Sequence, residues 1–78
     1  MNSAYHPVTK SPHTQGRFCV GEHELTSGDL IEFPDGDNQP IGRIEHDGVR
    51  YVVFVLMANL RYPLVELPEA AYVGRGTL

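Results

Sequence analysis

Four histidines and one cysteine are the residues of this chain that could bind a metal ion. His6 and His13 lie in a polar N-terminal stretch, whereas Cys19 and His23 are four residues apart across the end of an expected strand. That spacing does not place the two side chains next to each other on a strand. The chain also has no C-x-x-C or H-x-x-x-H pair of the kind that zinc sites use. We therefore expect no metal site.

Nucleophilic and phosphate-binding chemistry have no stronger basis in the sequence. Cys19 lies between Phe18 and Val20, where a free cysteine behaves as a small buried apolar residue. The chain contains no glycine-rich phosphate loop and no nucleotide-binding fingerprint. Residues 35–38 begin like a calcium loop but lack its later glycine and closing glutamate, so we interpret them as a turn. We predict a protein that is not an enzyme and has no cofactor.

The elements that position these residues are expected to be strands. Six prolines and eight glycines in 78 residues interrupt the chain too often for long helices. The one stretch longer than twelve residues without either, 49–62, is rich in residue types that favour strands. We predict a mostly β fold, a five- to six-stranded antiparallel SH3-like barrel or curled sheet with one short helical turn. The strands are expected at residues 17–20, 30–33, 41–46, 49–57, 62–67 and 72–73, and the helical turn at residues 68–71.

One small β domain, residues 16–74, is expected between a flexible N-terminal arm at residues 1–15 and a C-terminal tail at residues 75–78. The arm is polar and contains Pro7 and Pro12, without the alternation of a strand. A single cysteine excludes an intramolecular disulfide and fits a reducing compartment. No apolar run is long enough for a membrane span, and the N-terminus does not resemble a signal peptide. We expect a cytoplasmic protein that does not contact a membrane.

Asp47-Gly48 is the clearest turn signal in the chain and predicts a hairpin between residues 41–46 and 49–57. A two-residue loop would place Glu45 opposite Arg50, an ion pair across the two strands. It would also place Gly42 opposite Val53. The expected core face of the hairpin carries four residues, Ile44, Val49, Tyr51 and Val53.

The other face of this hairpin is polar at the tip and apolar at the base. Its apolar residues are Ile41, Val52, Phe54 and Leu56. Either the sheet curls to enclose them or another segment covers them, which could be the C-terminus or a second molecule. Arg61 and Tyr62 join these four as a predicted partner-binding or dimer face, because arginine and aromatic residues dominate binding hot spots.

The charges are distributed unevenly along the chain, whose net charge is −4. Residues 18–42 contain six acids and no base, and residues 1–17 contain two bases and no acid. A nucleic-acid-binding protein needs clustered cations to neutralise phosphates, so this balance disfavours a nucleic-acid partner. We predict an acidic edge that binds a protein with a basic surface, or that serves only solubility. The six residues of this acidic edge are Glu22, Glu24, Asp29, Glu32, Asp35 and Asp37.

Several short motifs are similar to those of an uncharacterised family of small bacterial proteins that is common in mobile genetic elements. They are Gly16-Arg17-Phe18, Ser27-Gly28-Asp29 followed by Glu32, Gly42-Arg43-Ile44-Glu45 and Tyr51-Val52-Val53. The chain departs from the family pattern at Ser27, where a cysteine is common, and it has no tryptophan near Tyr51. The resemblance implies a compact β fold of mobile-element origin and no particular activity.

Size, acidity and this resemblance together predict a non-enzymatic, protein-binding regulator from a phage or other mobile element. Its target would be a larger host protein that handles nucleic acid in defence, such as a CRISPR effector, which the regulator would occlude. Two alternatives stand beside it. One is a small nucleic-acid-binding barrel that uses Lys10, Arg17, Arg43 and Arg50, and the other is a homodimeric accessory subunit.

Overall fold

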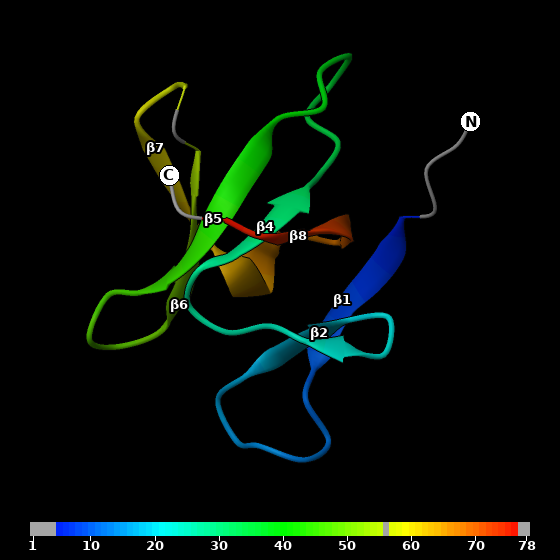
Figure 1. The fold of residues 1–78 in the computed structure, drawn as a ribbon, viewed down its shortest axis with the longest axis vertical. Helices are drawn as coiled ribbons and strands as arrows, with labels where there is room; N and C mark the ends of the chain where they lie inside the picture. Colours follow the sequence, from blue (N-terminus) through cyan, green and yellow to red (C-terminus); the bar gives the residue numbers. More distant parts are fainter. Residues whose placement is uncertain (1–4, 56, 77–78) are drawn as a thin grey trace.

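The computed structural model describes residues 5–55 and 57–76, which form one antiparallel sheet of eight strands (Figure 1). The strands and the single 3-10 turn are β1 (His6–Lys10), β2 (Phe18–Val20), β3 (His23–Glu24), β4 (Asp29–Glu32), β5 (Ile41–His46), β6 (Tyr51–Val55), β7 (Leu60–Pro63), η1 (Leu64–Glu66) and β8 (Glu69–Arg75). Their order across the sheet is β3-β2-β1-β8-β4-β5-β6-β7. The mostly β prediction is confirmed. The expected count of five or six strands is wrong, and the sheet is not closed into a barrel.

Two of the additional strands have no signal in the sequence because they depend on distant partners. β1 lies within the expected N-terminal arm and contains Pro7, yet it pairs with β2 on one side and with β8 on the other. β3 has only two residues and pairs with β2. Residues 6–10 therefore belong to the sheet, at a position that local residue preferences do not reveal.

The helical turn lies at residues 64–66, four residues before its expected position. Pro63 precedes it with an extended backbone, and Leu64 is completely buried, which fixes the turn against the core. Residues 69–71, expected to be helical, instead begin β8, where Ala70 is completely buried. β8 continues to Arg75, the first residue of the expected C-terminal tail. Burial of one leucine and one alanine thus outweighs the local preference of proline for a helix start.

The β5–β6 hairpin forms with a four-residue loop instead of the expected two-residue loop. His46 lies opposite Tyr51, Glu45 opposite Val52 and Gly42 opposite Val55. The carboxylate of Asp47 causes this, because its Oδ1 accepts hydrogen bonds from the backbone N–H groups of residues 49 and 50. The predicted register and the predicted Glu45–Arg50 pair are therefore wrong.

The shift in register is two residues, so most side chains keep their expected faces. Ile44 and Val53 are completely buried opposite each other, whereas Val49 leaves the expected core face and is 85% exposed in the loop. Gly42 permits this packing, because a Cβ atom there would collide with Cγ2 of Val53.

The hydrophobic core draws on strands from the whole sheet. Its completely or almost completely buried members include Leu25, Ile31, Phe33, Ile44, Val53, Leu64 and Ala70. Phe18 and Tyr62 pack against this core from its margin. Within the described residues, no helix has the length and apolar character needed to cross a membrane.

Candidate protein-binding surface

The six residues of the predicted acidic edge separate into three groups with different surroundings. Asp29 is the first group, since it is only 1% exposed and lies at the start of β4. Its Oδ2 accepts a hydrogen bond of 2.8 Å from the backbone N–H of Thr26 and lies 3.4 Å from Nε2 of His23. Nη1 of Arg75 and the hydroxyl of Tyr72 lie 3.2 and 3.5 Å from its Oδ1. This carboxylate joins β3, β4 and β8, so it is not part of the exposed surface of the predicted acidic edge.

Glu24 and Glu32 form the second group, in which half-buried carboxylates accept hydrogen bonds from other parts of the chain. Glu24 accepts one from the hydroxyl of Ser11 and another, of 3.2 Å, from Nη1 of Arg17. The Ser11 hydroxyl, helped by the Arg17 guanidinium, holds the pKa of Glu24 below its usual value. Glu32 accepts a hydrogen bond of 2.8 Å from the hydroxyl of Tyr5. Both carboxylates bind the N-terminal residues to the rest of the sheet.

The third group, Glu22, Asp35 and Asp37, is exposed and forms no ion pair with any described residue. Glu22 lies in the turn between β2 and β3, and the two aspartates lie in the loop between β4 and β5. That loop is ordered by its own backbone, because residue 35 and residue 38 exchange two hydrogen bonds of 2.9 Å. These three residues are therefore the part of the predicted acidic edge that is exposed to a binding partner.

Ion pairs use most of the positive charge of the molecule. Four of the five arginines lie within 4.0 Å of a carboxylate oxygen: Arg17 beside Glu24, Arg43 and Arg61 beside Glu45, and Arg75 beside Asp29. Only three of the ten carboxylates serve these four pairs. Among the charged side chains, all of which are described, seven carboxylates remain without a cation against two cations, Lys10 and Arg50. The ion pairs contain four cations and three anions, so the net charge of −4 comes from the side chains outside them.

The predicted partner-binding or dimer face lies on the outer side of β5, β6 and β7, where it is charged as well as apolar. Phe54 is half-buried there, with the guanidinium of Arg61 4.6 Å and that of Arg43 5.8 Å from its ring centre. Glu45 lies between these two arginines. The carboxylate and the ring thus hold both guanidinium groups in place.

The other residues of this predicted face are not gathered on one surface. Val52 is 5% exposed, whereas Ile41 is 45% exposed at the start of β5. Tyr62 lies opposite Val53 on the core side, with its ring edge against Phe33. Leu56 lies outside the described residues. The structure therefore assembles an arginine-aromatic cluster with exposed Ile41 beside it, and places Tyr62 with the core.

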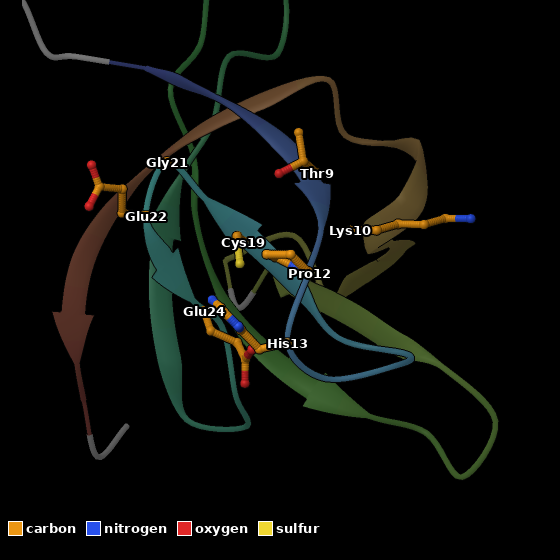
Figure 2. Close-up of a pocket in the computed structure, with 8 residues that line it drawn as sticks. All are labelled: Thr9, Lys10, Pro12, His13, Cys19, Gly21, Glu22 and Glu24. Carbon is orange, nitrogen blue, oxygen red and sulfur yellow. The ribbon is translucent and has the colours of Figure 1, made fainter.

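Three of the four histidines considered for metal chemistry, together with Cys19, lie around two hollows on the β1–β3 side of the sheet. Figure 2 shows the first, of ≈ 460 Å³, with Cys19 near Pro12, His13 and Glu24. Cys19 is buried and pairs across the ladder with Thr9 and Glu24. The described residues contain no group of three or more histidine, cysteine, aspartate or glutamate side chains placed to hold a metal ion.

The second hollow, of ≈ 520 Å³, is lined in part by His6, His23 and Tyr72. The rings of His23 and Tyr72 stack with their centres 3.7 Å apart, and both side chains also lie at Asp29. The histidine therefore takes part in the packing around a buried carboxylate. No sequence signal indicated this stack, because 49 positions separate its two residues along the chain.

Exposed apolar residues at one end of the sheet are a feature that sequence analysis missed. Met57 is 98% exposed in the turn between β6 and β7, and Leu60 is 47% exposed at the start of β7. The sequence placed Met57 inside a strand, so its exposure had no visible signal.

Comparison of the chain with protein-family models, with curated proteins and with solved structures found no significant match.

Proposed function

We propose that this protein is a non-enzymatic regulator that binds a larger protein through its acidic surface. The observation that carries the proposal is the acidity of the chain, whose net charge is −4, together with the seven carboxylates that lie outside its arginine ion pairs. Complementary charge accelerates encounter with a basic partner and suppresses binding to acidic ones. Glu22, Asp35 and Asp37 are the exposed members of the acidic edge and are its proposed contact residues.

A basic groove that normally holds nucleic acid is the surface that such an acidic protein fits. Occupation of the groove would exclude DNA or RNA by competition for the same cations. We propose a phage or mobile-element origin and a host defence complex, such as a CRISPR effector, as the target. The family resemblance of the sequence supports the origin, and the charge distribution supports the kind of groove.

The pairing of the arginines weighs against the nucleic-acid-binding alternative. Of its four predicted cations, Arg17 and Arg43 are already held by Glu24 and Glu45. Only Lys10 and Arg50 stay free to meet phosphates, which is fewer than the six to ten contacts of a typical DNA-binding protein. We therefore favour the protein-binding function.

A competition assay tests this proposal. Purified RNA-guided effector complexes from bacteria would be incubated with the protein, and their binding to target DNA measured by gel shift. We expect at least one effector to lose its DNA in proportion to the protein added. Asp35→Asn/Asp37→Asn should weaken this effect and reduce its salt dependence, and Glu66→Gln/Glu69→Gln controls for the change in net charge. An unchanged affinity and salt slope would remove the electrostatic basis, and no competition at all would contradict the proposed target.

A further inference from the structure

One end of the sheet carries both exposed apolar side chains and free carboxylates. We call it the loop end. It consists of residues 34–41, which are the loop after β4 and the first residue of β5, and residues 57–60, which are a turn and the first residue of β7. Register places them together, because Gly42 in β5 pairs with Val55 in β6, which pairs with Leu60 in β7. Both connections project at the upper end of the molecule in Figure 1.

Three of the seven exposed large apolar residues in the described chain belong to the loop end. They are Ile41, Met57 and Leu60, exposed by 45%, 98% and 47%. Scattered single residues of this kind need no explanation, but three within one end of a small sheet form a local concentration. Asp35 and Asp37 lie in the loop that leads directly into Ile41, and neither forms an ion pair. An apolar centre beside charged residues is the common composition of a protein-binding surface.

The two faces of the sheet restrict the shape of the partner surface that can contact the loop end. Leu60 lies on the face of Gly42, whereas Ile41, the residue before Gly42, lies on the opposite face. A flat partner could therefore contact Ile41 or Leu60 but not both. A partner that contacts both must surround the end of the sheet, where Met57 is also exposed.

We infer that the loop end is inserted into a groove of the partner protein, with apolar contacts to Met57, Ile41 and Leu60 and basic groove walls facing Asp35 and Asp37. This inference rests on the proposed function and specifies how the acidic surface is used. Grooves that hold nucleic acid have this chemistry, since cations bind phosphates and apolar or aromatic side chains stack on bases. The loop end would thus replace the nucleic acid in the groove, and both are negatively charged.

A matched pair of substitutions tests the inference. Met57 and Val49 lie in the two turns that flank β6, at opposite ends of the strand, and are 98% and 85% exposed. Both Met57→Ser and Val49→Ser should leave the unfolding midpoint unchanged, because neither side chain is packed. The probe is the effector complex that the competition assay identifies. We expect Met57→Ser to weaken its binding by about tenfold, as for a buried interface residue, and Val49→Ser to have no effect.

Photo-crosslinking gives a second measurement that does not depend on affinity. With p-benzoylphenylalanine at position 57 the effector should be crosslinked, and with the same residue at position 49 it should not. If the protein binds the effector but Met57→Ser has no effect and crosslinks form only from position 49, the loop-end inference is wrong while the proposed function stands. If the unmodified protein binds no effector, the proposed function itself fails and the inference fails with it.

Discussion

The turn at residues 26–29 and the loop at residues 34–40 lie at opposite ends of β4, and both carry aspartates in the same acidic run. Their carboxylates nevertheless have opposite surroundings. Asp29 is buried among groups from β3, β8 and its own turn, whereas Asp35 and Asp37 are exposed and contact no cation. Charge in a sequence therefore does not identify a binding residue until its neighbours are known.

The comparison also shows that the acids of one small sheet differ in what they contribute to its stability. Asp29 connects β4 with β3, which precedes it, and with Arg75 of β8, 46 positions away, so it stabilises the sheet. Within the described residues, the carboxylates of Asp35 and Asp37 contact no other strand, so we expect their substitution to leave the fold unchanged.

Removal of the Asp29 carboxylate should have the largest effect on stability. Asp29→Ala leaves the Thr26 N–H, the Tyr72 hydroxyl and the Arg75 guanidinium without their acceptor. Because Arg75 is exposed and solvent weakens its pair with Asp29, the loss comes mainly from the hydrogen bonds to the buried carboxylate, and a hydrogen bond to a charged group contributes about 1.5–3 kcal/mol. Urea unfolding measures the free energy of unfolding, and Asp37→Ala serves as the exposed control. A loss below about 1 kcal/mol would show that Asp29 does not hold the strands together.

Arg75→Met should have the next largest effect, because it removes one partner of Asp29 and a hydrogen bond of 3.0 Å to the carbonyl of Ser27. Arg75 is itself exposed, so solvent reduces the strength of the pair. We expect a loss of about 1–2 kcal/mol in the free energy of unfolding. The control is Arg50→Met, which removes an exposed arginine outside any ion pair. Equal losses for the two variants would mean that the Asp29–Arg75 pair contributes nothing.

Acidification should weaken the attachment of the N-terminal residues through Glu24. The pKa of Glu24 is lowered in the folded protein, chiefly by the Ser11 hydroxyl, so protonation favours the unfolded chain. The stabilising contribution is present above the usual glutamate pKa and is lost as pH falls through the lowered folded value. Ser11→Ala should raise the pKa of Glu24, which NMR titration of the side-chain carboxyl measures. A pKa that stays equally low in the variant would exclude the hydroxyl as the cause.

Asp35→Asn/Asp37→Asn should have the smallest effect on the fold. Both carboxylates are exposed, and the loop is held by backbone hydrogen bonds between residues 35 and 38. Substitutions of this kind change the free energy of unfolding by no more than about 0.5 kcal/mol. Chemical denaturation of the double variant checks this. A larger loss would place these aspartates in the same structural class as Asp29.

Much of the fold follows from local features of the sequence. Residues 30–33 and 41–46 were expected as strands and lie close to β4 and β5. Alternating apolar residues and turn-forming residues act over a few positions, so they are visible without the rest of the chain.

The errors arose where a single turn signal was outweighed by other contacts. The Asp47-Gly48 pair favours a two-residue loop, but the Asp47 carboxylate accepts hydrogen bonds from two backbone N–H groups of the same turn, which has four residues. The Pro68 signal for a helical turn yielded to β8, which lies between β1 and β4. The first contact is local, whereas the pairing of β8 joins segments that are far apart along the chain.

The mostly β fold class and the net charge follow from the sequence alone, because strand preference, turn residues and acid content are properties of short segments. Which carboxylates lie outside ion pairs depends on the tertiary structure. Asp29, Glu24 and Glu45 are neutralised by arginines from 2 to 46 positions away, and Asp35 and Asp37 are not. The tertiary structure also brought Met57 and Leu60 to the same end of the sheet as the acidic loop. Hydrogen bonds between strands produce both results, since they join segments that have no contact along the chain.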